Sequence, residues 1–170
     1  MKLRFPEAAI PDWANRYVYP REETTLLDLR PVVRKAGYLT KGQLRQVAQW
    51  KSPRSAGHIE DNEDAYIRDI TSMSFSAKTE RGRIEVLIRL SGVEWPSASV
   101  ILHLFHKRKY PILDYRALWS VQAENRSQYS FDFWWAYVEY CRELAERNQI
   151  DMRILDRALW QYSKENQGKR

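Results

Sequence analysis

Asp114 is the residue whose type and setting most suggest chemistry, because it follows three apolar residues in the stretch YPILDYRALW, residues 110–119. A carboxyl group in such a place can act as a general acid or base. It can equally cap the helix that follows, by accepting free N–H groups of the first turn. A second copy, ILDRALW at residues 154–160, puts Asp156 in the same setting, and we interpret Asp156 as a helical residue on a solvated side. Both roles stay open at Asp114.

A tight connection upstream of Asp114 is the second feature with chemical potential. The stretch LSGVEWPSAS joins an apolar helix that ends at Leu90 to another that begins near Ser97, with Gly92 as the flexible residue. Two helices joined this closely bring together the unpaired amides of the turn and of the second helix's first turn. Such amides can bind phosphate, and because they read no base edges they position a duplex without specifying its sequence.

The two features lie at a recognisable spacing, since Asp114 follows Gly92 by 22 positions (114 − 92). Together they resemble the helix-hairpin-helix DNA glycosylases, such as the adenine-mismatch glycosylase and endonuclease III, which carry L-P-G-V-G-x-x-T-A and, one helix later, a catalytic aspartate. The resemblance covers about residues 79–121. The matching residues are Leu90, Gly92, Val93, Ser97 and Ala98 in the hairpin, and Pro111, Ile112, Leu113 and Asp114 before the next helix.

The resemblance implies double-stranded DNA as partner and Asp114 as the carboxylate that hydrolyses the glycosidic bond of a base flipped out of the duplex. We favour a noncatalytic or weakly catalytic DNA-binding relative in which the cap is retained. The alternatives are an active monofunctional N-glycosylase that uses Asp114 to activate water, and a protein-interaction module without DNA binding. The expected DNA-binding residues are Gly92, Val93, Glu94, Trp95, Ser97, Ala98, Lys107, Arg108 and Lys109.

Three departures from the family pattern limit the chemistry. Glu94 replaces the second hairpin glycine and puts a negative charge where a phosphate would approach. Pro96 occupies the position at which bifunctional members carry a lysine nucleophile, which excludes Schiff-base chemistry from that site. The single cysteine, Cys141, excludes an iron–sulfur cluster built from this chain. We therefore expect no cofactor.

Other candidate ligands have simpler explanations. His103 and His106 lie three residues apart and have no third ligand at a recognisable spacing, so we interpret them as core or rim residues. The acidic residues near the start of the next helix are favoured there by the helix dipole. They are Glu60, Asp61, Glu63 and Asp64. We expect no metal site.

Composition indicates a globular protein. The 170 residues are 44% hydrophobic, which fits one domain over residues 1–170, and the net charge of +6 is compatible with a polyanionic partner but common in proteins without one. No apolar run approaches 18 residues and no apolar block follows the N-terminal charges, so neither a membrane span nor a secretory signal is indicated. We expect a cytoplasmic protein.

The elements that must position these residues are all helical. No segment alternates convincingly between apolar and polar residues, so the sequence predicts a compact all-α domain of roughly eight helices that contains a helix-hairpin-helix. Residues 1–22 hold three prolines, and we expect an extended arm there. The hairpin spans residues 79–106, and further helices occupy residues 130–166.

Several helix ends are marked in the sequence. Thr40 with Gln43 predicts a capping box. Asn62, Thr79 and Ser130 predict further N-caps. One more helix is expected over residues 23–35, with Pro31 near an end or a kink and Gly37 ending it. Clusters of basic residues are expected on solvated faces, at Lys107, Arg108 and Lys109 and at Arg81, Arg83 and Arg89.

Overall fold

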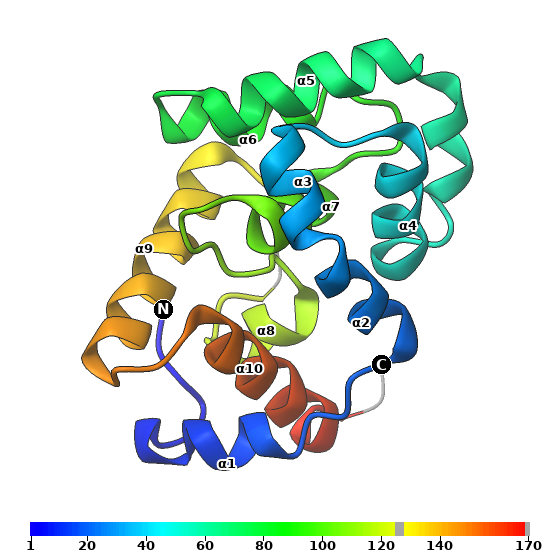
Figure 1. The fold of residues 1–170 in the computed structure, drawn as a ribbon. Helices are drawn as coiled ribbons and strands as arrows, with labels where there is room; N and C mark the ends of the chain where they lie inside the picture. The colour runs from blue at the N-terminus through cyan, green and yellow to red at the C-terminus, as the bar shows by residue number, and fades with distance from the viewer. Residues whose placement is uncertain (125–127, 169–170) are drawn as a thin grey trace. The chain divides into compact units, whose positions relative to one another are not determined.

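The computed structural model describes residues 1–124 and 128–168, and their regular structure is entirely helical (Figure 1). The expected all-α class is therefore confirmed. The helices are η1 (Glu7–Ala9), α1 (Ile10–Asn15), α2 (Arg21–Asp28), α3 (Arg30–Ala36), α4 (Lys41–Lys51), η2 (Ala56–Asp61), α5 (Asp64–Ser76), α6 (Glu80–Leu87), α7 (Trp95–Phe105), α8 (Tyr115–Ser120), α9 (Phe131–Arg147) and α10 (Met152–Asn166), where η marks a 3₁₀-helix. Of the helices within the described ranges, none is long and apolar enough to cross a bilayer.

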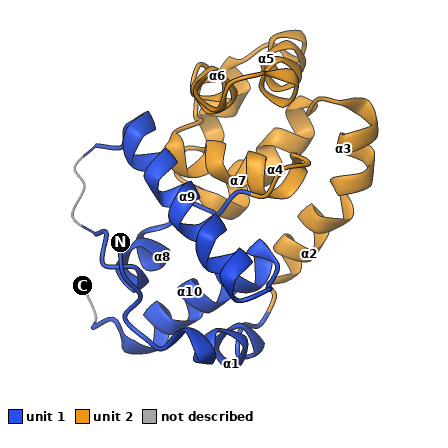
Figure 2. Ribbon diagram, turned by 90° about the vertical axis from the view of Figure 1, so that its left-hand side faces the viewer, with its two compact units in different colours: residues 1–18, 110–170 blue, residues 19–109 orange. Residues whose placement is uncertain are grey.

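The chain divides into two compact units (Figure 2). Unit 1 combines residues 1–18 with residues 110–170, and unit 2 consists of residues 19–109. The expectation of one domain over the whole chain stays a prediction. Each unit is described by itself.

Unit 2 is built around α7, and every residue from Ser97 to Phe105 is buried. The helix is apolar on all sides, as the run SASVILHLF predicts, and it packs against α3, α4 and α6. Helices α5 and α6 pack against each other. Ile84 and Leu87 of α6 and the apolar residues of α7 from Ala98 onward are therefore core residues of this unit, whereas Val86 and Ile88 are half-buried.

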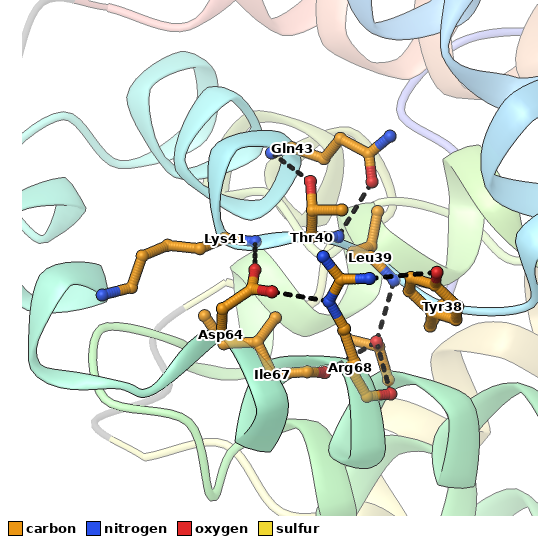
Figure 3. Close-up of polar contacts among 9 residues, drawn as sticks. Tyr38, Leu39, Thr40, Lys41, Gln43, Asp64, Ile67 and Arg68 are labelled. Atoms are coloured by element: carbon orange, nitrogen blue, oxygen red, sulfur yellow. Dashed lines mark hydrogen bonds and ion pairs between the residues drawn. The ribbon is translucent and has the colours of Figure 1, made fainter.

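The start of α4 is tied to α5 by a polar network (Figure 3). The predicted capping box is confirmed, since Thr40 Oγ1 accepts from the Gln43 N–H at 3.4 Å and Gln43 Oε1 accepts from the Thr40 N–H at 2.9 Å. Asp64 of α5 accepts from the Lys41 N–H at 2.8 Å and pairs with Arg68 Nε at 2.5 Å. The network therefore satisfies amides of the first turn of α4 with side chains of two helices.

A buried hydroxyl completes this junction. The Leu39 N–H donates to Thr71 Oγ1 at 2.9 Å, and the Thr71 hydroxyl donates to the Ile67 carbonyl at 2.8 Å. Leu39 and Thr71 are both fully buried. Because water does not reach this buried amide, loss of the Thr71 hydroxyl would leave the Leu39 N–H without a hydrogen-bond acceptor.

Unit 1 is organised by α10, which packs against α1, α8 and α9. Its inward residues Leu155, Ala158 and Leu159 are fully buried. The N-terminal residues run beside the end of α8, because the Lys2 and Arg4 N–H groups donate to the carbonyls of Val121 and Ser120 at 3.0 and 2.9 Å. The first residues of the chain are thus part of this unit.

Residues 1–22 are not the extended arm that the prolines suggested. They contain η1 and α1, and Pro11 lies in the first turn of α1, where a missing N–H costs nothing. Ile10 and Ala14 are buried, while Trp13 lies 5.1 Å from the ring of Tyr162 in α10. The prolines mark helix starts, and the apolar residues between them have the spacing of a short amphipathic helix.

The helix expected over residues 23–35 is divided into α2 and α3. The division falls at Leu29, and Pro31 occupies the first turn of α3, which agrees with its expected place near an end or a kink. Gly37 ends α3 with a left-handed φ of 79°. That conformation is open to glycine at little cost.

Candidate functional site

The α6–α7 turn, residues 88–94, lies between two helices that the sequence predicted. Thr79 caps α6 by accepting from the Gly82 N–H at 3.1 Å, as expected. Gly92 has a φ of 79°, and the Val93 N–H donates to the Leu90 carbonyl at 3.1 Å. Helix α7 begins at Trp95, slightly earlier than expected, because Pro96 fits a first helical turn that needs no N–H donor.

Asn62 holds this turn in place. Its Oδ1 accepts from the Ser91 N–H at 2.9 Å, and its Nδ2 donates to the Ser91 carbonyl at 3.0 Å and to the Ile59 carbonyl at 3.1 Å. The sequence predicted Asn62 as the N-cap of α5, which is wrong, because Glu63 occupies that position without a side-chain cap. The buried Asn62 amide instead satisfies both backbone groups of a residue far along the chain.

Gly92 lies in close contact with the segment that begins at Ser55. A Cβ atom on Gly92 would lie 2.8 Å from the Ser55 carbonyl oxygen, 3.1 Å from Ile59 Cδ1 and 3.2 Å from His58 Cβ. One side of the turn is therefore covered by η2 and the residue before it. The glycine is required both for its positive φ and for this close approach.

The side chains at the turn carry charges of both signs. Glu94 is exposed at the N-cap position of α7 and makes no capping hydrogen bond. Asp61 accepts from the Ser91 hydroxyl at 3.4 Å and lies 3.6 Å from His58 Nδ1. Arg89, an exposed cation, also lies within the turn, directly before Leu90. The turn is therefore not a purely basic surface.

The expected DNA-binding residues do not form one patch. The side chains of Val93, Ser97 and Ala98 are buried, and Trp95 is half-buried. The N–H groups of Val93 and Ala98 already donate to the carbonyls of Leu90 and Glu94 at 3.1 and 2.8 Å. The exposed residues 107–109 follow the opposite end of α7. The ten residue steps from Trp95 to Phe105 span about 15 Å at the usual helical rise. Lys107, Arg108 and Lys109 are thus separate from the turn.

The basic cluster around α6 was expected on a solvated face, and for Arg83 this is wrong. Its side chain is buried, donates to the Ala77 carbonyl and pairs with Glu80 at 2.7 Å. Arg81 pairs with Glu85 at 2.9 Å. Arg81 and Arg83 are therefore paired with glutamates of their own helix, whereas Arg89 is exposed, as expected.

Asp114 belongs to unit 1, whereas the α6–α7 turn belongs to unit 2. The expected cap is confirmed, because Asp114 Oδ1 accepts from the Arg116 N–H at 2.9 Å at the start of α8. The residue is half-buried. An N-cap role and a catalytic role are compatible at this residue.

Asp156 is not on a solvated side, contrary to our interpretation of the sequence. It is buried, accepts from the Ile112 N–H at 3.1 Å and pairs with Arg153 Nη1 at 3.1 Å. The Tyr137 hydroxyl donates to the Ile112 carbonyl at 3.3 Å. Both backbone groups of Ile112 are therefore held by side chains, which fixes the segment that leads to Asp114.

The thiol beside this segment is chemically inert. Cys141 is fully buried and hydrogen-bonded to Tyr137, and burial raises the pKa of both side chains. A thiolate or phenolate is the reactive form, so neither group supplies a nucleophile near neutral pH. Trp134, on the same helix as Cys141, is also fully buried.

His103 of α7 and His106, which follows the last residue of that helix, are both buried, as the core interpretation expected. His106 Nδ1 accepts from the Arg108 N–H at 2.9 Å, and burial together with the nearby Arg83 charge lowers its pKa. Across residues 1–124 and 128–168, no group of three or more His, Cys, Asp or Glu side chains is arranged to hold a metal ion.

Comparison with known proteins returned no relatives. The chain matches no family model, no curated protein and no solved structure.

Proposed function

We propose that this protein binds double-stranded DNA without sequence preference, through backbone amides of residues 91–98, as a helix-hairpin-helix protein related to the base-excision glycosylases. The single observation that carries the proposal is the anchored α6–α7 turn. Gly92 has the required positive φ, and Asn62 holds both backbone groups of Ser91. A turn that is ordered before its ligand arrives loses little conformational entropy on binding.

Backbone amides are the natural donors at this place. The first N–H groups of a helix have no intrahelical acceptor, and the helix dipole adds partial positive charge there. The buried side chains of Ser97 and Ala98 cannot reach base edges. Binding of this kind contacts phosphates and is therefore independent of sequence.

Glu94 opposes such binding by its charge. A phosphate about 5 Å from its carboxylate is disfavoured by about 0.8 kcal/mol in water, which corresponds to about a fourfold loss of affinity at low salt. We therefore expect Glu94→Gln to bind duplex DNA several times more tightly than the wild type. The exposed Glu22 of α2 provides a matched control, because Glu22→Gln removes the same charge from another helix of unit 2.

The test is fluorescence anisotropy with labelled duplexes of two unrelated sequences at about 50 and 200 mM salt, since phosphate contacts make affinity fall with salt. The proposal requires salt-sensitive binding, equal for both sequences, that Glu94→Gln strengthens more than Glu22→Gln does. Absence of binding at the lower salt concentration would refute it and favour the protein-interaction alternative. Equal effects of the two substitutions would remove the turn from the binding surface.

Glycosylase activity is the second candidate function, and the anchoring of Ile112 favours it. The Asp156 carboxylate and the Tyr137 hydroxyl hold the segment that ends at Asp114, so that carboxylate has a fixed place in unit 1. A fixed carboxylate can stabilise the positive charge that develops on a sugar when the glycosidic bond breaks, or activate the attacking water.

A conservative pair of variants tests this second function. Asp114 and Asp151 make the same cap, each accepting from the N–H two residues later at 2.9 Å. Asparagine caps a helix about as well as aspartate does, so both Asp→Asn variants should keep their stability. The assay is alkali cleavage at abasic sites in duplexes with damaged or mismatched bases. Activity lost only in Asp114→Asn supports catalysis, and activity retained in that variant refutes it.

A further inference from the structure

A cavity of about 450 Å³ opens in unit 2 at the C-terminal end of α7. Its volume lies in the range of small-molecule sites. Elements from three parts of the unit meet there: α3 with the glycine that ends it, the last turns of α5, and the end of α7 with the residues that follow. The lining residues are Arg34, Gly37, Ser72, Phe75, Ser76, Phe105, His106, Lys107 and Arg108.

The wall of the cavity is aromatic. Phe75 is half-buried, and its ring centroid lies 6.4 Å from that of His106 at an interplanar angle of 54°. Phe105 and His106 also line the cavity and are buried, with 2% and 8% of their surface exposed. A planar apolar group that entered the cavity would therefore meet the Phe75 ring, which is the most exposed of the three.

The rim of the cavity is cationic. Arg34, Lys107 and Arg108 line it, and none of its lining residues is acidic. Arg34 is positioned by its own bonds, since Nε donates to the Phe105 carbonyl at 3.1 Å and Nη2 to the His106 carbonyl at 3.0 Å. Its charge offsets the partial negative charge of the α7 carboxyl end. Lys107 and Arg108 then give the rim its positive potential.

Two contacts hold the rim residues in place. Arg108 Nη1 pairs with Glu80 at 2.7 Å, which orients its guanidinium but compensates part of its charge. The Arg108 N–H donates to Nδ1 of the buried His106 at 2.9 Å, which requires a ring unprotonated at that nitrogen. Lys107, which lies between His106 and Arg108 in the chain, is exposed. Lys107 therefore contributes most of the charge that an anion would meet.

We propose that this cavity binds a nucleotide, with the planar base against Phe75 and the phosphate at Lys107 and Arg108. An aromatic wall and a cationic rim within one cavity match a ligand that is planar at one end and anionic at the other. A free nucleotide and the terminal nucleotide of a strand share this chemistry. The inference goes beyond the proposed function, because the cavity does not include any residue of the α6–α7 turn.

The experiment is isothermal titration of the full chain with four probes: adenosine 5′-monophosphate, adenosine, ribose 5-phosphate and a 5′-phosphorylated dinucleotide. The nucleotide should bind at least about tenfold more tightly than either half, because both ends of the ligand contribute. A dinucleotide that binds more tightly than the mononucleotide would identify a strand end as the ligand. A mononucleotide that binds as well or better would identify a free nucleotide.

Matched variants locate the binding. Lys107→Gln should weaken nucleotide binding about tenfold through loss of a charge-assisted bond to phosphate. Lys35→Gln, on the exposed surface of α3 and outside the cavity lining, should leave it unchanged. Phe75→Leu should reduce the advantage of the nucleotide over ribose 5-phosphate, and circular dichroism checks that this variant is folded.

Three results would overturn the proposal: no binding of the nucleotide at millimolar concentration, equal binding of ribose 5-phosphate and the nucleotide, or equal affinity in Lys107→Gln and Lys35→Gln. Failure of the DNA-binding proposal is a separate outcome. Glu94→Gln lies at the other end of α7 and should leave nucleotide binding unchanged.

Discussion

Alanine substitution at two glycines separates backbone strain from steric contact at the α6–α7 turn. Gly37 and Gly92 both have a φ of 79°, so alanine is strained equally at both positions. At Gly37 a Cβ atom would meet nothing within 4 Å. At Gly92 it would lie 2.8 Å from the Ser55 carbonyl oxygen, a backbone atom that cannot turn away as a side chain can. Only Gly92→Ala must therefore move the turn.

The size of each effect follows from these contacts. A left-handed alanine costs about 1–2 kcal/mol, which is the whole expected loss for Gly37→Ala. In Gly92→Ala the turn must also move off Ser55, which stretches the two hydrogen bonds between Asn62 and Ser91. At about 1 kcal/mol for each bond, the total loss becomes about 3–4 kcal/mol. For a chain of this length the melting temperature should fall by about 2–8 °C in Gly37→Ala and by about 6–16 °C in Gly92→Ala.

The assay is urea unfolding followed by circular dichroism, with thermal melts as a second measure. The free energy of unfolding should fall by about 2 kcal/mol more in Gly92→Ala than in Gly37→Ala. Equal losses in the two variants would contradict the close seating of Gly92 on Ser55. Asn62→Asp adds a check, because it removes the donor to the Ser91 carbonyl and should weaken the same contact.

Two further predictions concern the junction of α4 and α5. Thr71→Val should lower the free energy of unfolding by about 1–3 kcal/mol in urea titrations, because it leaves the buried Leu39 N–H without its acceptor, whereas Thr71→Ser keeps the hydroxyl and should cost less. Hydrogen bonds from the Lys41 N–H and from Arg68 lower the pKa of Asp64. The stabilisation by Asp64 should therefore be present above the ordinary carboxyl pKa and disappear as pH falls through its lower folded value. Urea titrations of the wild type and of Asp64→Asn from about pH 6 to 2 compare their free energies of unfolding. The difference between the two proteins should shrink as the pH falls, and parallel profiles would contradict the prediction.

Capping signals were the part of the fold that the sequence predicted best. Thr40, Thr79, Ser130 and Asp114 all accept the backbone N–H groups expected of an N-cap. A cap joins residues two or three positions apart, so that its partners are visible in the sequence. The buried run of α7 was equally clear, because a helix that is apolar on all sides has to lie inside.

Residues whose partners are distant in the chain were misassigned. Asn62 binds Ser91 across 29 positions, and Asp156 binds Ile112 across 44. Either residue also fits an ordinary local role, as a cap or as a solvated helical acid. Local patterns cannot show that a buried backbone group elsewhere requires this acceptor. The partner becomes apparent only when the tertiary structure brings the segments together.

The turn between α6 and α7 shows how little net charge says about a binding surface. The +6 of the whole chain is compatible with a polyanionic partner, but within unit 2 Arg81 pairs with Glu85, and Arg83 and Arg108 share Glu80. At the turn itself the exposed Glu94 is negative. Attraction for phosphate there can come from the exposed Arg89 and from backbone amides, whose dipoles are the same whatever side chains surround them. A substitution at Glu94 tests the proposed interface directly, because it removes a repulsive charge from the turn and leaves both sources of attraction in place.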